Sequence, residues 1–312
     1  MATKRELINR WSSEPGRTIL ERVHAFFRKT EMPGHGRDSA ELFALLDGLP
    51  FREEVPRGVD LRGALLGGGT RDLDLHGCHF TYAKLTINLV DCDLSGACFD
   101  DVVGGNGILL DRLDGASFAR AKLPSTFFRG ARARQCCFDQ ASLFGSSFEG
   151  ADLSGSSFRD ADCRRSRFLR AILIGCDMRG ARLDESAFQE VALDGTTDLR
   201  GASLVNIFDH DLHDRAGNLV ARGTAWRQAR LDATTRYGSD PSVSARELID
   251  AALALLENNT APWTAAAADA LRRCRVSEGD DKSWYERVLA AVAPEARPEL
   301  EAVFADAMRR LL

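Results

Sequence analysis

Apolar residues recur at every fifth position through the middle of this chain of 312 residues. A strand repeats its side-chain pattern every two residues and a helix every 3.6, so neither element explains a period of five. A fixed repeat of this kind instead indicates stacked units that bury their apolar faces on one another. The unbroken series is Val103, Ile108, Leu113, Phe118, Leu123, Phe128, Ala133, Phe138, Leu143, Phe148, Leu153, Phe158, Cys163, Phe168, Leu173, Met178, Leu183, Phe188 and Leu193.

A second series, two positions before the first, consists mostly of small residues such as Ala141, Ser146 and Ala151. In each group of five we therefore expect one large and one small side chain to point inward and three to point outward. The clearest unit, Ala151-Asp152-Leu153-Ser154-Gly155, resembles the repeat of the pentapeptide-repeat family. The resemblance implies a mainly β fold, a right-handed quadrilateral parallel β-helix with four units per coil, in which residue i lies beneath residue i+20.

The outward charges support a coil of twenty residues independently of the resemblance. If residues i and i+20 lie about 4.8 Å apart on adjacent coils, their charges should be complementary. Within the unbroken series, like charges meet at Arg112/Arg132 and Arg159/Arg179. Opposite charges meet at Asp114/Arg134, Arg129/Glu149, Arg132/Asp152, Asp139/Arg159, Asp162/Arg182, Arg164/Asp184, Arg165/Glu185 and Arg170/Glu190.

The pattern divides the chain into three parts. Residues 1–57 lack the repeat and contain helical patterns opened by capping boxes, as at Thr3 to Glu6 and Thr18 to Glu21, so we expect an α-helical N-terminal cap. Residues 58–238 are the predicted β-helix, with register slips near Gly67–Gly69, at Thr86 and at Asp100–Asp101. Residues 239–312 return to helical patterns and are predicted to form a C-terminal helical domain that caps the last coil.

Composition limits where and with what the protein works. The net charge of −5 favours neither direct nucleic-acid binding nor a strongly acidic tail. No apolar run is long enough to span a membrane, and no signal peptide opens the chain. The eight cysteines lie largely in the inward series, where they read as small apolar fillers in a reducing compartment. We therefore expect a cytoplasmic protein with free thiols and no membrane partner.

No group of residues in the sequence predicts catalysis. Two groups contain possible metal ligands: His210 with His213, and His76, Cys78 and His79 with Cys92. Neither group has the spacing of a known zinc site, so a solvated loop and core packing are the favoured interpretations. A flat-sided solenoid also offers no deep pocket. The expectation is a protein that is not an enzyme, with no catalytic residue, no metal and no cofactor.

The favoured function is a non-enzymatic scaffold that binds a partner protein through the faces of the β-helix. Its selective surfaces are expected where charge of one sign gathers, in acidic first coils and an arginine-rich middle. An ordinary solvated, ion-paired surface is the alternative interpretation of the same charges. The candidate partner-binding residues are Asp72, Asp74, Asp91, Asp93, Asp100, Asp101, Arg159, Arg164, Arg165, Arg167, Arg170 and Arg179.

Two other functions stay open. Some pentapeptide-repeat proteins resemble B-DNA in width and charge, bind DNA gyrase or topoisomerase IV and protect these enzymes from poisons, so the resemblance makes a type II topoisomerase a possible partner. Those proteins dimerise through C-terminal helices, and this chain could form a homodimer in the same way. However, residues 59–238 hold 24 acidic and 22 basic residues, which argues against DNA mimicry along the whole rod.

The other alternative is an effector-type enzyme with its activity in the C-terminal helical domain. Its candidate nucleophile would be Cys274, between Arg273 and Arg275. A thiol nucleophile usually needs a neighbouring base, and no histidine follows His213.

Overall fold

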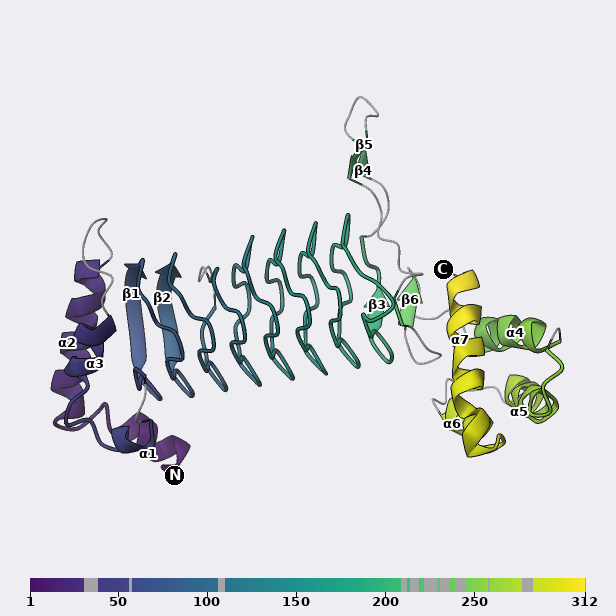
Figure 1. Cartoon of the computed structure of the whole chain (residues 1–312), viewed down its shortest axis with the longest axis horizontal. Coiled ribbons are helices and arrows are strands. Elements are labelled where there is room, and N and C mark those ends of the chain that lie inside the picture. Colours follow the sequence, from purple (N-terminus) through teal and green to yellow (C-terminus); the bar gives the residue numbers. More distant parts are fainter. Residues whose placement is uncertain are drawn as a thin grey trace.

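The computed structural model describes residues 1–30, 39–55, 58–105, 110–208, 212–213, 219–221, 229–230, 236–238, 245–257, 259–276 and 283–311. Figure 1 shows a row of stacked coils with helices α1–α3 at one end and helices α4–α7 beyond the other. The coils form a β-helix, because each pairs in parallel with the next along the chain.

The N-terminal helices are α1 (Lys4–Asn9), α2 (Gly16–Thr30) and α3 (Ser39–Leu45), followed by the short 3-10 helix η1 (Arg52–Glu54). The predicted capping box at Thr3 and Glu6 is confirmed. The box predicted at Thr18 is wrong, because α2 begins two residues earlier and the Thr18 hydroxyl donates instead to Glu14. Helix α2 packs against the first coil, where Nε2 of His24 lies 2.7 Å from the carbonyl oxygen of Leu65.

The first coils are one residue shorter than the sequence predicts. Strands β1 (Leu65–Arg71) and β2 (Lys84–Val90) pair in parallel with Leu65 opposite Lys84, a spacing of nineteen residues. In β2 the buried residues Leu85, Ile87 and Leu89 alternate with exposed ones, as in an ordinary strand with one buried face. These strands lie at the predicted slips near Gly67 and Thr86, where seven extended residues replace the pentad geometry.

The same shortening corrects one predicted core residue. Val103 was expected to point inward, but it is exposed and Val102 is fully buried in its place. The reason is the nineteen-residue coil, in which Val103 bridges Lys84 on one side and Lys122 on the other. The slip predicted at Asp100–Asp101 is wrong, because the bridged positions Asp93, Cys98 and Val103 keep a spacing of five across it. Ile108, the next member of that series, lies outside the described residues.

The predicted spacing of twenty holds in the middle of the chain. Parallel bridges join residues twenty apart from Arg112 and Arg132 to Ile172 and Ala192. The described large residues of the series from Leu113 onward are all buried, and so are the small residues two positions before them. The spacing then lengthens to 21, as at the bridge between Asp177 and Asp198, where the sequence series also shifts.

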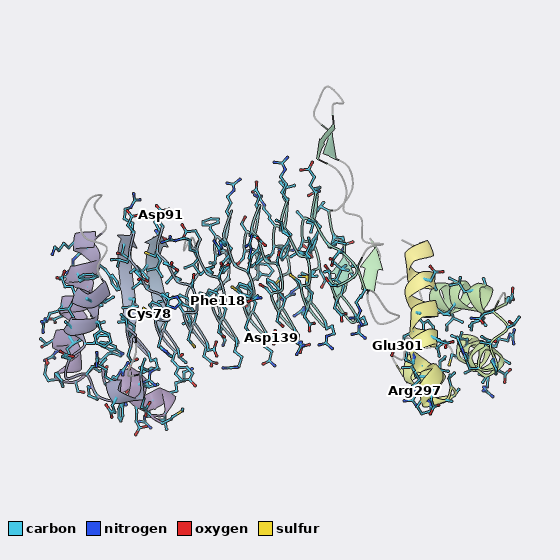
Figure 2. The ribbon with its side chains drawn as sticks, in the orientation of Figure 1. Cys78, Asp91, Phe118, Asp139, Arg297 and Glu301 are labelled. Carbon is cyan, nitrogen blue, oxygen red and sulfur yellow. The ribbon has the colours of Figure 1, made fainter. Side chains whose placement is uncertain are left out.

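Phenylalanine rings fill this narrow core in two stacked columns. Phe118, Phe138 and Phe158 belong to one column, with nearly parallel rings whose centroids lie 4.6 to 5.0 Å apart. Phe128 and Phe148 belong to the other, with centroids 4.7 Å apart, and the two columns meet edge to face. Figure 2 shows Phe118 within the coils and Asp91 at their outer edge. Offset-stacked and edge-to-face contacts are both favourable for aromatic rings, so the register of the coils is fixed from inside.

Four short strands follow the regular coils, and two of them, β4 and β5, stand away from the row of coils (Figure 1). The four strands are β3 (Ser203–Val205), β4 (Leu212–His213), β5 (Leu219–Ala221) and β6 (Arg236–Gly238). Strand β3 pairs in parallel with β6, while β4 and β5 form an antiparallel pair. Arg230 bridges Asp198, which supports the predicted repeat unit that begins at Ala229.

The C-terminal helices are α4 (Ala245–Leu256), α5 (Thr264–Val276), α6 (Ser283–Ala290) and α7 (Arg297–Leu311), with the 3-10 turn η3 (Pro294–Ala296) before α7. Helix α4 packs against both α5 and α7, and α5 packs against α6. Ile249, Leu256, Leu271, Leu300 and Phe304 are buried in their core. None of the described helices is long and apolar enough to cross a membrane.

The cysteines lead to a prediction about thiol reactivity. Burial raises the pKa of Cys78, Cys92, Cys136 and Cys176 to about 12, and it also raises the pKa of the buried Cys163. A protonated, buried thiol reacts slowly. Alkylation of the native protein should therefore modify the half-buried residues Cys98, Cys137 and Cys274 first.

After unfolding without reductant, alkylation should modify all eight cysteines. Mass spectrometry of the digested protein provides the measurement. Recovery of a disulfide-linked pair, or modification of native Cys163 as fast as Cys98, would contradict the packing described above.

Candidate interaction surfaces

Four rows of outward positions run along the β-helix, each defined by parallel bridges between successive coils. Row 1 is Asp74, Asp93, Arg112, Arg132, Asp152, Ile172 and Ala192. Row 2 is Asp60, His79, Cys98, Ser117, Cys137, Ser157, Asp177, Asp198 and Arg230. Row 3 is Leu65, Lys84, Val103, Lys122, Ser142, Asp162, Arg182, Ser203 and Arg236. Row 4 is Phe127, Ser147, Arg167, Ala187 and Phe208. Backbone hydrogen bonds hold these rows in place, so a side chain's position follows from its place in the coil.

The start of row 1 is strongly acidic. Asp74 and Asp93 are bridged neighbours in this row, and the turn before it carries Asp72, Asp91 and Asp111. These five carboxylates form no ion pair within the described residues. We call them the acidic patch. The structure thus brings together four of the candidate residues and adds Asp111, which was not among them.

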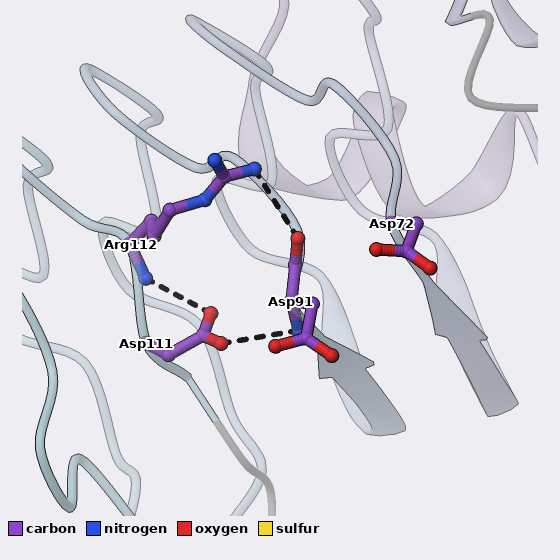
Figure 3. Close-up of a pocket in the computed structure, with 4 residues that line it drawn as sticks. All are labelled: Asp72, Asp91, Asp111 and Arg112. Atoms are coloured by element: carbon purple, nitrogen blue, oxygen red, sulfur yellow. Dashed lines mark hydrogen bonds between the residues drawn. The ribbon is translucent and has the colours of Figure 1, made fainter.

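Part of the acidic patch is a shallow hollow of about 290 Å³ lined by Asp72, Asp91, Asp111 and Arg112 (Figure 3). The Asp111 carboxylate accepts hydrogen bonds from the backbone N–H groups of Asp91 (3.1 Å) and Arg112 (2.9 Å). The Arg112 guanidinium donates to the carbonyl oxygen of Asp91 rather than to a carboxylate. Burial raises the pKa of Asp111, and the charge of Asp91 raises it further, against the bond from Arg112.

The other candidate residues do not share one surface with the acidic patch. Asp100 and Asp101 follow row 2, where Asp101 forms an ion pair with Arg120 at 2.7 Å. Among the arginines, Arg159 and Arg179 follow row 2, and Arg164 follows row 3. The remaining ones are Arg165 at the turn after row 3, Arg167 in row 4 and Arg170 at the turn after row 4.

Most of these arginines are neutralised by nearby carboxylates. Arg165 pairs with Glu185 and Arg170 pairs with Glu190, both at the expected spacing of twenty. Arg159 and Arg179 instead share Asp177, and Arg164 pairs with Asp162. Within the described residues Arg167 is exposed and has no ion pair. Apart from Arg167, the arginine-rich middle is therefore a set of local ion pairs distributed along rows 2, 3 and 4.

Four of the eight predicted charge pairs are direct ion pairs in the structure: Arg129–Glu149, Arg165–Glu185, Arg170–Glu190 and Arg182–Asp162. Two other predicted pairs are Asp114 with Arg134 and Asp139 with Arg159. In each of these pairs the backbone N–H of the arginine, and not its guanidinium, donates to the carboxylate. The guanidinium groups of these two arginines reach Asp152 and Asp177, eighteen residues away.

Asp177 leads to a prediction about pH. Burial raises the pKa of this carboxyl, but hydrogen bonds from Arg179 and Arg159 outweigh burial and hold the pKa at about 2. Because the folded pKa is lower than the unfolded value of about 3.9, the stabilisation is present above about pH 4. It is lost as the pH falls from about 4 to about 2, and its size is on the order of 2 kcal/mol.

Urea unfolding of the wild type and of Asp177→Asn at several pH values provides the measurement. The variant should lose less stability than the wild type between pH about 4 and about 2. Asp160→Asn is the matched control, since Asp160 is exposed and forms no ion pair within the described residues. Parallel curves for wild type and Asp177→Asn would contradict the prediction.

Exposed apolar side chains are the feature that the sequence analysis missed. Large apolar residues are exposed at Leu65 and Val103 in row 3, and at Phe127 and Phe208 in row 4. Phe144 is also exposed, with the guanidinium groups of Arg164 and Arg165 each 5.7 Å from its ring centre. The sequence does indicate these exposed side chains, because apolar residues occupy outward positions of some pentads. One example is Phe127, directly before the inward Phe128.

The possible metal ligands fall partly within the described residues. Among the described residues, no group of three or more His, Cys, Asp or Glu side chains is arranged to hold a metal ion. Cys78 and Cys92 are buried in the core, as the packing interpretation predicted. His210 and the side chain of His213 lie outside the described residues. Cys274, the candidate nucleophile, lies with Arg273 and Arg287 in an open groove between α5 and α6.

A family model of pentapeptide repeats matches the chain in eight copies, over residues 112–150, 136–168, 146–185 and 161–197. Among curated protein sequences, no match was found.

Solved structures with detectable similarity include pentapeptide-repeat proteins. Rfr23 from the cyanobacterium Cyanothece 51142 is 17% identical, with 42% of this chain and 90% of that chain covered and a TM-score of 0.32. QnrB1, described as a plasmid-mediated fluoroquinolone resistance protein, is 23% identical, with coverages of 44% and 78% and a TM-score of 0.27. HetL from Nostoc sp. strain PCC 7120, described as involved in heterocyst differentiation regulation, is 20% identical, with coverages of 48% and 76% and a TM-score of 0.19.

Proposed function

Since this chain is a pentapeptide-repeat protein over residues 112–197, we propose that it is a non-enzymatic scaffold that binds a partner protein through the outward rows of its β-helix. The acidic patch carries this proposal. Its five carboxylates have no ion pair within the described residues, whereas five of the six candidate arginines are paired within the chain. Unpaired charge of one sign on a rigid face favours a partner of the opposite charge, so the patch fits a basic protein surface.

In the experiment, three versions of the chain are each purified from the native cell, and the proteins that co-purify with each version are compared. We expect wild type to retain a specific partner and Asp74→Lys/Asp93→Lys to lose at least about nine-tenths of it, because both charges face the partner. The control is the exchange Arg165→Glu/Glu185→Arg, which keeps an ion pair and should keep the partner. Equal recovery from all three versions, or no specific partner for wild type, would count against the proposal.

We propose the same division of the chain into three domains that the sequence predicts. Residues 1–57 and 239–312 are proposed to cap a right-handed, four-sided β-helix of residues 58–238. The packing of α2 against β1 supports the N-terminal cap. A cytoplasmic location is also proposed, supported by five cysteines that pack as apolar filler residues.

The alternative function, binding a type II topoisomerase by mimicking DNA, requires a different distribution of charge on the surface. A protein that mimics DNA along its length needs acidic rows over the whole β-helix, but many carboxylates of the middle coils form ion pairs with arginines, such as Glu149, Asp177 and Glu185. A gyrase supercoiling assay, with and without a poison, tests this alternative. Rescue of supercoiling by this protein would assign it to the topoisomerase-protecting class.

We also propose a homodimer through the C-terminal helices. An open groove between α4 and α7 is lined by the half-buried residues Leu255, Trp263 and Val303, with Trp263 Nε1 donating to Glu299 at 2.8 Å. This groove leaves apolar surface for a second copy. Light scattering should give a dimer for the full chain and a monomer for Leu255→Glu/Val303→Glu. A monomeric wild type at micromolar concentration would remove the proposal.

A further inference from the structure

Row 3 begins with four outward residues that alternate between apolar and cationic. Leu65 lies opposite Lys84, and Lys84, Val103 and Lys122 are successive bridged neighbours. Leu65 is 52% exposed and Val103 is 43% exposed, and both lysines are exposed as well. We call these four residues the lysine-apolar row.

The lysine-apolar row is rigid. The backbone N–H groups of Lys84, Val103 and Lys122 donate to the preceding coil over 2.8, 3.0 and 2.7 Å. The residues that follow Leu65, Lys84 and Lys122 point into the core and are fully buried, namely Leu66, Leu85 and Leu123. The apolar side chains are therefore held outward by regular structure and not by a loose loop. A partner could bind them without ordering the backbone first.

The charge of this row is uncompensated. Neither lysine forms an ion pair within the described residues, and no carboxylate occupies row 3 before Asp162. Asp162 is itself paired with Arg164 at 2.7 Å and with Arg182 at 3.5 Å. The row therefore presents two positive charges separated by apolar surface. A complementary partner presents acidic groups for Lys84 and Lys122 and apolar groups for Leu65 and Val103.

The distance between adjacent coils favours an α-helical partner. Adjacent strands lie about 4.8 Å apart, and an α-helix rises about 5.4 Å per turn. A helix lying along the row therefore offers one side chain to each coil, with a mismatch of only about 0.6 Å per step. Side chains on one face of an extended strand recur about every 6.8 Å and lose register after one step.

We propose that the lysine-apolar row binds an α-helix of a partner protein that presents acidic and apolar side chains on alternate turns. This inference rests on the proposed scaffold function but uses residues outside the acidic patch, so the two proposals can fail separately. The helix would place carboxylates over Lys84 and Lys122 and apolar side chains over Leu65 and Val103. A helix with only acidic or only apolar side chains on this face would match two of the four residues of the row.

The probe is a synthetic four-turn helical peptide with Leu and Glu on alternate turns of one face and Ala and Gln elsewhere. Fluorescence anisotropy of the labelled peptide with the full-length protein measures binding. Lys84→Glu/Lys122→Glu should weaken binding at least about tenfold, because two attractions become repulsions. Val103→Ser should also weaken it, and salt raised from about 0.05 to about 0.5 M should reduce the charge-dependent part.

The matched control is Arg167→Glu, which reverses an exposed charge in row 4 and should leave peptide binding unchanged. Three results would overturn the inference: no peptide binding by the wild type, equal binding by Lys84→Glu/Lys122→Glu, or equal binding of a proline-containing, non-helical peptide of the same composition. Lysine-dependent binding of duplex DNA or anionic vesicles in place of the peptide would also overturn it. If the peptide fails while Asp74→Lys/Asp93→Lys still loses the native partner, the inference fails and the scaffold function stands.

Discussion

Phe148→Asp is expected to prevent folding of the β-helix. Phe148 is fully buried, and its ring stacks on Phe128 at 4.7 Å and on Phe168 at 5.0 Å. Phe138 and Phe158 contact the same ring edge to face. An aspartate here would place an unpaired charge among four aromatic rings, a cost well above what a folded domain can absorb. Circular dichroism and size-exclusion chromatography should show an unfolded or aggregated product.

Two further variants make this result specific. Phe148→Ala removes the ring without adding charge and should destabilise by about 3–5 kcal/mol. Glu149→Ala changes the next residue, which points outward and pairs with Arg129 at 2.8 Å, and should cost under about 1 kcal/mol. If Phe148→Asp and Glu149→Ala melted at the same temperature, the inward assignment of Phe148 would be wrong.

Asp60→Ala is expected to release the N-terminal helices from the first coil. The Asp60 carboxylate is fully buried and accepts hydrogen bonds from both terminal nitrogens of Arg10 at 2.9 Å, and the same two oxygens also accept hydrogen bonds from Arg62. Burial alone would raise the pKa of Asp60, but the hydrogen bonds from Arg10 and Arg62 hold it below its ordinary value. Removing the carboxylate leaves the buried Arg10 guanidinium without its counter-charge, which should cost about 3–5 kcal/mol.

Limited proteolysis and hydrogen exchange over residues 1–55 measure this release. The double variant Arg10→Met/Asp60→Leu is the control, because replacing both charges with apolar groups avoids a stranded buried ion. It should protect residues 1–55 better than Asp60→Ala does. Equal protection in wild type and Asp60→Ala would show that this ion pair does not hold the helices.

Much of the fold follows from the sequence because its pattern is redundant. Nearly every pentad places its own Leu or Phe inward, with Ala133, Cys163 and Met178 as the exceptions, so the column from Leu113 to Leu193 does not depend on any single residue. The outward charges independently give the spacing of twenty that bridges Arg112 to Arg132. The first coils differ because a missing residue can be absorbed at several places with similar sequence patterns. Val102 and Val103 are equally apolar, and only the hydrogen-bond register decides which one is buried.

The candidate surface was less predictable for a physical reason. An arginine side chain can reach carboxylates 2, 18 or 20 residues away on this surface, as Arg179, Arg159 and Arg165 do. Sequence spacing alone cannot choose among them, so the arginine-rich middle looked like one patch when it is a set of separate pairs. The acidic patch was partly predictable because few basic residues lie within its reach. The lysine-apolar row was missed because Val103 was assigned to the core.

Site-specific photo-crosslinking in the native cell tests the central claim, that a partner protein binds the outward rows, most directly. A photoreactive residue is placed at Asp74, at Lys84, or at the exposed position Glu257 after α4. We predict crosslinks to a protein partner from Asp74 and Lys84 at much higher yield than from Glu257. Equal yields at all three positions, or no protein crosslink from any outward row, would contradict the account.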